Sequence, residues 1–248
     1  MKIDEFGVAH ERRCCASYKS NIWSYDFVQS LSSEFTAPSY KARAEELKEE
    51  FRQLWGQVSD FSKLHIIDSI SKLGLSYVFH KEIKEALGGM ISCLDNASGF
   101  RDDLQSTSLC FRLLRQHGYN ISQDLFINLI DEMGFLKEGV HSNLTGVLEL
   151  FEASHLAVHG EGLLVKAKAF SGQYLINNRK NMDVDLGNRV AHALELPCHW
   201  RVTWFDVRQQ IHAYELKEDK NPILLELAKL NFNICQGLHL QDLQELSR

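Results

Sequence analysis

Apolar side chains recur at helical spacing along most of this 248-residue chain. In residues 42–55 they stand at i, i+4, i+7 and i+8, and two later segments, around residues 64–71 and over residues 80–94, show a similar helical spacing. The members are Leu47, Phe51, Leu54 and Trp55, then Leu64, Ile67 and Ile70 with Ser71, and then Ile83, Ala86, Leu87, Met90 and Leu94 of residues 80–94. This spacing places one apolar stripe on each segment and predicts amphipathic helices that pack on a core.

Helix start signals add two further segments. Ser122 stands where it can cap a helix that carries Leu125, Ile127, Leu129 and Ile130. Asn221 followed by Pro222 forms a cap and first-turn pair for a helix over residues 222–236. The sequence shows no repeat of fixed period, which argues against a solenoid. These patterns together predict roughly ten to twelve helices joined by short polar links.

Composition favours the same fold class. With 44% hydrophobic and 24% charged residues the chain can bury a sizeable core. Only 3 prolines and 15 glycines leave few breaks for the many turns of an all-β fold. The predicted fold is therefore all-α, with an extended amino-terminal arm over residues 1–40 and one helical domain over residues 41–248.

The charge balance limits the classes of partner. The net charge is −6 at pH 7, whereas nucleic acid or an anionic membrane would require clustered Lys and Arg. No apolar run approaches the roughly 20 residues of a transmembrane helix. Residues 1–30 include Asp4, Glu5 and Glu11 and lack the pattern of a secretory signal or a plastid transit peptide. The sequence predicts no nucleic-acid partner, no membrane span and a cytoplasmic location.

Two acidic pairs are candidates for chemistry. Asp102 and Asp103 could begin a Mg²⁺ motif, because two acids on one helical turn can share a hard cation. However, Ser106 stands where a third acid is needed, so charge at a helix N-terminus is the favoured interpretation. Asp183 and Asp185 lie in a polar stretch, and a turn is at least as good an interpretation for them.

Histidines and cysteines offer no stronger signal. His155 and His159 have the i, i+4 spacing of a metal-binding helix, but Leu156 replaces the glutamate base of a zinc protease. "GEGLL" (160–164) is too short for a dinucleotide loop. The six cysteines form no C-x-x-C pair and no zinc spacing, and are interpreted as free thiols: Cys14, Cys15, Cys93, Cys110, Cys198 and Cys235. We therefore predict no catalytic residue and no metal site in this chain.

Five collinear blocks that span nearly the whole chain carry a resemblance to a known family. They resemble the amino-terminal domain of plant terpene synthases, in the family's order. The blocks are "RRCCASYKSNIW" (12–23), "FRLLRQHGYNISQDLF" (111–126), "LFEASHLAVHGEGLLVKAKAFSGQYL" (150–175), "ALELPCHWR" (193–201) and "NPILLELAKLNFNICQGLHLQDLQELSR" (221–248).

The resemblance implies an α/α-barrel-like (toroid) helical domain preceded by an arm with an arginine-rich motif that ends in tryptophan. In the family this arm lies across the mouth of a separate catalytic domain and shields carbocations from water. The corresponding residues are Arg12, Arg13 and Trp23. The guanidinium groups of the two arginines would match diphosphate oxygens. Nine residues separate Arg13 from Trp23, one more than in the family's common form, so a gapless match places Arg12 outside the motif.

The Mg²⁺ motif D-D-x-x-D of the family's catalytic domain is missing from residues 1–248, as is the D-x-D-D motif of class II cyclases. The resemblance therefore implies a terpene synthase of mono- or sesquiterpene biosynthesis, dependent on Mg²⁺ or Mn²⁺ and acting on geranyl or farnesyl diphosphate. We expect this chain to lack the catalytic domain, to be inactive alone, and to self-associate through the face left uncovered. The alternatives are a non-catalytic pseudoenzyme or interaction module and, third, a glycoside-hydrolase-like toroid, for which no spaced carboxylate pair is found.

Overall fold

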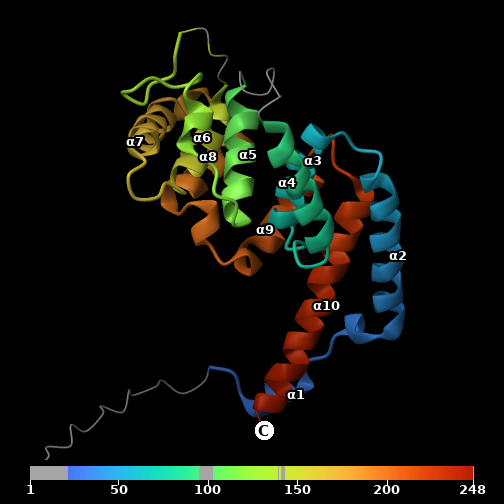
Figure 1. Cartoon of the computed structure of the whole chain (residues 1–248). Helices are drawn as coiled ribbons and strands as arrows, with labels where there is room; N and C mark the ends of the chain where they lie inside the picture. The colour runs from blue at the N-terminus through green and yellow to red at the C-terminus, as the bar shows by residue number, and fades with distance from the viewer. Residues whose placement is uncertain (1–21, 95–102, 139, 141–142, 248) are drawn as a thin grey trace, which may run out of the picture.

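The computed structural model describes residues 22–94, 103–138, 140 and 143–247 (Figure 1). Within these ranges the only β pairing is a single bridge between Ile130 and Leu136. The predicted all-α class is therefore confirmed. The described residues form ten α-helices in chain order: α1 (Tyr25–Ser30), α2 (Pro38–Trp55), α3 (Asp60–Lys72), α4 (His80–Leu94), α5 (Leu104–Gln116), α6 (Leu144–Ser154), α7 (Gly162–Asn177), α8 (Val184–Glu195), α9 (Thr203–Glu215) and α10 (Pro222–Leu246).

The helices form an inner and an outer layer. Helices α5 and α6 are buried on nearly every side and pack along each other, while α3 contacts α5. Helices α4 and α9 cover α3, and α7 and α8 cover α6. Helices that are buried all round belong at the centre of a domain. This layering accords with the α/α-barrel-like arrangement predicted for the domain.

Helix α5 separates two hydrophobic cores. Leu109 and Leu113 point into a core shared with α2, α3, α4, α9 and α10. Leu104 and Phe111 point into a second core shared with α6, α7 and α8, where Phe111 packs edge-on against Phe126 at 5.1 Å between ring centroids. Because α5 packs against a core on each side, almost none of its surface reaches solvent. A charged residue of this helix, such as Arg112, is therefore buried.

Helix α10 is the longest helix and leaves the body of the domain (Figure 1). Its start follows the prediction, because the Asn221 side chain accepts a hydrogen bond from the Leu224 N–H and Pro222 occupies the first turn. It runs to Leu246, beyond the predicted end at 236, because the 3₁₀ helix Glu34–Thr36 and α1 pack along its distal half, while α2 contacts its first half through Arg43 and Glu226. Gly237 allows this approach, since an added Cβ would stand 3.0 Å from Thr36 Cγ2.

One predicted helix is wrong. Ser122 does cap a helix, accepting from the Asp124 N–H, but only the short 3₁₀ helix Gln123–Phe126 follows. The chain then turns, and the Asp131 side chain accepts hydrogen bonds from the N–H groups of Met133 and Phe135. Leu129 and Ile130 are buried by this turn. Tertiary burial, and not a helical stripe, explains the apolar positions there.

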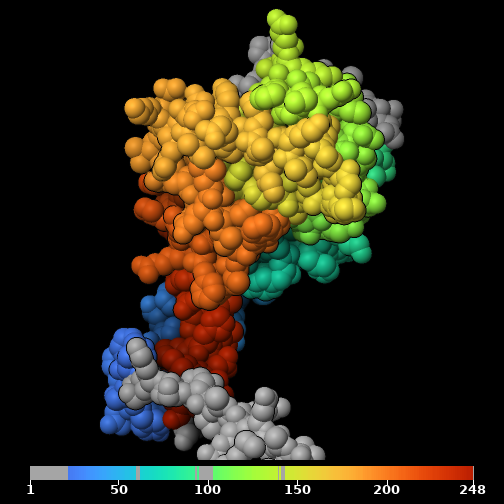
Figure 2. Space-filling view, turned by 90° about the vertical axis from the view of Figure 1, so that its left-hand side faces the viewer, coloured from blue at the N-terminus to red at the C-terminus, as the bar shows by residue number. Residues whose placement is uncertain are grey.

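The predicted arm of residues 1–40 is described from residue 22 onward. This part holds α1, the 3₁₀ helix Glu34–Thr36 and the first turn of α2, which begins at Pro38. Figure 2 shows this amino-terminal segment, in blue, against the distal part of α10, in red. No helix in the described ranges is both long and apolar enough to cross a membrane.

Candidate functional site

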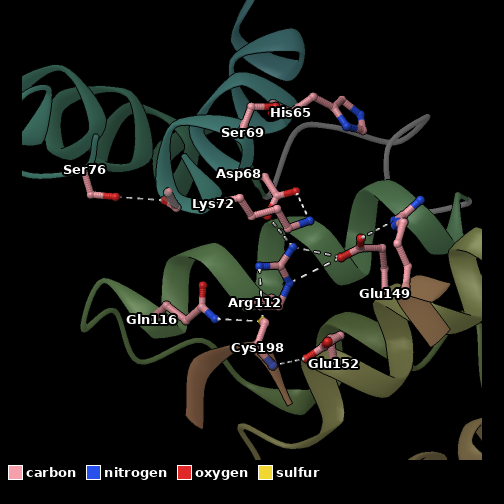
Figure 3. A network of polar contacts seen from close by, with 12 residues as sticks. His65, Asp68, Ser69, Lys72, Ser76, Arg112, Gln116, Glu149, Glu152 and Cys198 are labelled. Carbon is pink, nitrogen blue, oxygen red and sulfur yellow. Dashed lines mark hydrogen bonds and ion pairs between the residues drawn. The ribbon is translucent and has the colours of Figure 1, made fainter. Parts of the chain in front are cut away.

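Arg112 organises a buried network of charges where the inner helices meet (Figure 3). From α5 its Nη2 donates to Asp68 Oδ1 of α3 at 2.8 Å and to Glu149 Oε2 of α6 at 2.9 Å. Its side chain is only 3% exposed. Lys72 pairs with the other oxygen of Asp68 at 2.6 Å, and Arg189 of α8 lies 3.8 Å from Glu149. The network thus ties four helices through charge-assisted hydrogen bonds.

Burial and pairing act in opposite directions on these charges. Burial alone would raise the pKa of Asp68, but Lys72 and Arg112 outweigh it and hold that pKa far below its usual range. Burial alone would lower the pKa of Arg112, but Asp68 and Glu149 hold it well above its usual value. Both groups therefore stay ionised at neutral pH. Because each charge is paired, the network is suited to holding helices together and not to proton transfer.

A second arginine of α5 fixes the loop that leads into α7. Arg115 pairs with Glu161 and donates to the backbone carbonyl groups of Ile121 and Leu156. The pairing with Arg115 lowers the pKa of Glu161. Glu161 is the acidic residue of the "GEGLL" stretch (160–164). Its ion pair with Arg115 gives this stretch a structural role.

A third group of polar side chains lies at the end of α6. Glu152, Cys198 and His199 bring a carboxylate oxygen, a thiol sulfur and an imidazole nitrogen within 4.8 Å of one another. Glu152 Oε2 accepts a hydrogen bond from the Cys198 N–H at 2.9 Å. Burial raises the pKa of the Cys198 thiol to about 11 and lowers the pKa of His199. Without a bound ion, the thiol is therefore protonated and the imidazole neutral at pH 7.

The segment that carries Trp23 is held against the far end of α10. Trp23 is exposed and stacks on Phe27 at 5.1 Å between ring centroids. Gln29 donates to the Gln244 carbonyl at 2.8 Å, and Gln244 donates in return to the carbonyl groups of Val28 and Leu31. We call these reciprocal bonds the glutamine clasp. The clasp joins residues more than 200 positions apart and fixes where the amino-terminal arm leaves the domain.

The clasp gives a local prediction. Replacing Gln244 by Ala removes both donated bonds, so α1 should detach more often and the amides of residues 25–31 should exchange with solvent at least about threefold faster, as expected for a small, locally unfolding unit. The melting temperature of the whole domain should hardly change. Hydrogen exchange followed by mass spectrometry measures this, with Gln241→Ala, an exposed position on the same helix, as the control. Unchanged exchange in Gln244→Ala would contradict the clasp.

Several predicted candidates have structural explanations. Asp103 caps α5 by accepting from the Ser106 N–H at 2.7 Å, which confirms the helix N-terminal interpretation, and Asp102 lies outside the described residues. Asp183 caps α8, with Asp185 in its first turn. Helix α6 ends at Ser154, so His155 and His159 do not share a helical face. Of the predicted lid residues, Arg12 and Arg13 lie outside the described part, and Trp23 is placed as above.

Sequence reasoning missed the buried groups. Arg112 interrupts the apolar run of α5, Glu149 and Glu152 interrupt that of α6, and Asp68 interrupts the stripe of α3; charges inside apolar runs were the available signal. Lys, Arg, Asp and Glu are almost never fully buried without a partner. Four such residues therefore imply pairing, although the sequence alone does not say which acid meets which base.

Comparison with known proteins identifies the family. Residues 22–194 match the family described as "Terpene synthase, N-terminal domain". The chain belongs to the terpene synthase family. Alpha-farnesene synthase of Ricinus communis is 45% identical over 248 residues, which cover 99% of this chain and 44% of that protein. (+)-epi-alpha-bisabolol synthase of Phyla dulcis is 42% identical, over 95% of this chain and 44% of that protein.

Solved terpene synthase structures share the fold. A limonene synthase crystallised with 2-fluorolinalyl diphosphate matches with a TM-score of 0.84 at 34% identity, covering 92% of this chain and 43% of that chain. Isoprene synthase of grey poplar, crystallised with three Mg²⁺ ions and dimethylallyl-S-thiolodiphosphate, matches with a TM-score of 0.77 at 37% identity, covering 92% and 43%. This chain therefore spans somewhat more than two fifths of the length of these relatives.

The described residues of this terpene synthase chain do not fit a cluster of Mg²⁺ ions. Magnesium prefers octahedral oxygen ligands, usually carboxylates, water and substrate phosphates. Asp68 and Glu149 are occupied by Arg112. Within the described ranges, the only group of three convergent His, Cys, Asp or Glu ligands is Glu152, Cys198 and His199, which has one carboxylate. No step of a Mg²⁺-dependent reaction is therefore assigned to these residues.

Proposed function

We propose that residues 1–248 form the amino-terminal domain of a terpene synthase of mono- or sesquiterpene biosynthesis, whose substrate is a prenyl diphosphate such as geranyl or farnesyl diphosphate. The observation that carries this proposal is the family match over residues 22–194. Relatives named for farnesene, bisabolol and terpineol synthesis, which align with 95–99% of this chain, support the same product classes. Mg²⁺, or Mn²⁺ in its place, would be bound by a catalytic domain that follows these residues.

In this proposal the chain supplies structure and a lid, and the catalytic domain supplies the chemistry. The Arg112 network and the two cores hold the domain together, and α10 leads toward its partner domain. Arg12, Arg13 and Trp23 belong to the arm, which would close over the diphosphate side of the active site and exclude water. The support for this role is the sequence resemblance of residues 12–23, together with the hydrogen bonds that hold residues 28–31, shortly after Trp23, to the far end of α10.

An apolar surface at the far end of α10 supports docking of a further domain. The Gln244 contacts place residues 28–31 against the end of α10, and six large apolar side chains of residues 23–31 and of the last turns of α10 are exposed at this end. We call them the basal surface: Trp23, Tyr25, Phe27, Leu31, Leu243 and Leu246. Each is an exposed large apolar side chain, and Leu246 is 86% exposed. Exposed apolar patches commonly mark interfaces. In the purified chain, where no further domain covers the basal surface, we propose that two copies of the chain associate through it.

Self-association is measured by analytical ultracentrifugation of the purified chain. We expect the mean mass to rise with concentration and Leu246→Gln to raise the dissociation constant roughly tenfold, as for loss of one buried leucine side chain. Phe205→Gln is the matched control, because Phe205 is 84% exposed but lies on α9, away from the basal surface. A wild-type chain that stays monomeric at every concentration would refute this use of the surface.

The alternative function is a non-catalytic module, and its support is the poor fit of the described residues to Mg²⁺. Sequencing the transcript beyond the codon of Arg248 separates the two. The proposed function predicts an open reading frame that encodes D-D-x-x-D, and a stop codon directly after Arg248 would favour the module. A cytoplasmic location also stays a prediction, and the distribution of a fluorescent fusion to the complete reading frame tests it.

A further inference from the structure

We propose that Glu152, Cys198 and His199 form a binding site for a zinc-class divalent transition-metal ion. The three side chains come from two elements that are brought together by packing. Glu152 lies in the last turn of α6, and Cys198 and His199 form most of the 3₁₀ helix Cys198–Trp200. Figure 3 shows Glu152 and Cys198 side by side below Arg112. The inference goes beyond the proposed function and does not depend on it.

The ligand atoms fit this class of metal. Zinc binds thiolate at about 2.3 Å and imidazole or carboxylate at about 2.0–2.2 Å, so two ligands of one tetrahedral ion lie roughly 3.5 Å apart. The three ligand atoms here lie within 4.8 Å of one another, so small side-chain rotations close the remaining gap. A sulfur, a nitrogen and a single oxygen donor suit zinc and its neighbours, whereas Mg²⁺ and Ca²⁺ prefer oxygen.

The hydrogen bonds around the cluster leave its donors available. The Nδ1 of His199 is buried and has no hydrogen-bond partner among the described residues, although buried polar atoms are nearly always paired. Cys198 Sγ accepts long N–H contacts from Arg112 at 3.9 Å and from Gln116 at 3.7 Å, and its thiol also hydrogen-bonds to the neighbouring Glu152 carboxylate. Glu152 is oriented by the Cys198 N–H, in the way that outer hydrogen bonds orient metal-binding carboxylates.

A further nitrogen stands near the cluster. The His155 ring lies 6.5 Å from the His199 ring, measured between centroids. Its Nδ1 is 2.9 Å from the Phe151 carbonyl oxygen, which can only accept, so Nδ1 carries the proton and Nε2 keeps a lone pair. Metal-binding histidines commonly donate their second N–H to a backbone carbonyl in this way. The fourth position of the ion is left to this nitrogen or to water.

The charges also balance on binding. The Cys198 thiol would lose its proton to solvent, and the resulting thiolate with the Glu152 carboxylate would neutralise a divalent ion. The guanidinium of Arg112 is already paired with Asp68 and Glu149, so it adds little net repulsion toward a cation. A neutral unit of this kind is suited to a partly buried position.

The test is a titration of the metal-free 248-residue chain with Co²⁺, used as a spectroscopic substitute for Zn²⁺. We expect one equivalent to produce an intense thiolate-to-cobalt band in the near ultraviolet, which Zn²⁺ abolishes and excess Mg²⁺ leaves unchanged. Cys198→Ser should lose the band. Cys235→Ser, which removes another free and partly buried thiol, should keep it.

A second variant keeps the test valid if Cys198→Ser folds poorly. Glu152→Gln retains an oxygen that accepts from the Cys198 N–H, so its circular dichroism should match the wild type while the Co²⁺ affinity falls at least tenfold. The proposal is overturned if Cys198→Ser binds Co²⁺ with the same band as the wild type, if the wild type shows no stoichiometric band, or if Glu152→Gln binds as tightly as the wild type.

Discussion

Purified residues 1–248, supplied with Mg²⁺ and geranyl or farnesyl diphosphate, are expected to form no terpene above a control without protein. Ionisation of an allylic diphosphate requires positive charge held in place against the leaving group. The described acids that converge in this chain are paired with arginines or stand beside a thiol and an imidazole. The rate should therefore lie at the uncatalysed level, at least about 10⁶-fold below that of a typical enzyme.

Gas chromatography of the headspace and of an extract measures this loss. The intact alpha-farnesene synthase of Ricinus communis, purified in the same way, serves as the positive control. Volatile product from the 248-residue chain that disappears on addition of chelator would contradict the prediction, because it would require a catalytic metal site within these residues.

Arg112→Ala is expected to destabilise the domain by about 3 kcal/mol, since it removes the shared partner of the buried Glu149 and the partly buried Asp68. Lys72 remains beside Asp68 and Arg189 beside Glu149, so the loss lies at the lower end for breaking a buried pair. For a domain of this size the melting temperature should fall by about 10 °C. Arg43→Ala is the matched control. Arg43 also meets several acids, Glu46, Glu50 and Glu226, but in solvent, where ion pairs contribute little. Its melting temperature should be close to that of the wild type.

The effect of Arg112→Ala should depend on pH in a defined direction. The pKa of Asp68 in the folded protein lies below its unfolded value of about 3.9. Its contribution to stability is therefore complete above pH 4 and is lost as the pH falls toward the folded pKa. Thermal unfolding of both proteins at several pH values should show their difference narrowing below pH 4. A difference that stays constant with pH would contradict the ionised pairing.

A triple variant separates pairing from packing. Arg112→Met combined with Asp68→Asn and Glu149→Gln removes the charges together, and should regain much of the stability that Arg112→Ala loses. If the triple variant is as unstable as Arg112→Ala, the shape of the arginine side chain and not its charge would explain the loss.

The helix predictions agree best with the structure for helices that have one buried face and one solvent-exposed face. Helices α2 and α4 show a single stripe, and their predicted ranges, 42–55 and 80–94, agree with Pro38–Trp55 and His80–Leu94. The predicted helix after Ser122 is wrong, because Leu129 and Ile130 are buried in a turn that follows the short 3₁₀ helix Gln123–Phe126. A helical spacing of apolar residues indicates a helix only if those residues are buried along one helix face. Apolar residues in a loop that packs on a neighbouring helix can show the same spacing without a helix.

The candidate sites were harder to predict, because their members are far apart in the sequence. Arg112 is 44 residues from Asp68 and 37 from Glu149, and Gln29 is 215 residues from the backbone oxygen of Gln244 that it contacts. No spacing rule connects such residues. Cys198 and His199 were adjacent in the sequence, but Glu152, which completes their cluster, comes from α6. Only tertiary packing brings these groups together: α5 against α3 and α6, α1 against α10, and the 3₁₀ helix Cys198–Trp200 against α6.

The most direct test of the account joins residues 1–248 to the catalytic half of the alpha-farnesene synthase of Ricinus communis, the relative that aligns with 99% of this chain. Product formation from farnesyl diphosphate and Mg²⁺ is compared, by gas chromatography, between this chimera, residues 1–248 alone and the catalytic half alone. The account predicts farnesene from the chimera, well above the sum of the two halves. A chimera that folds, as judged by circular dichroism, yet makes no more product than the catalytic half would contradict the claim that this chain is a working terpene synthase domain.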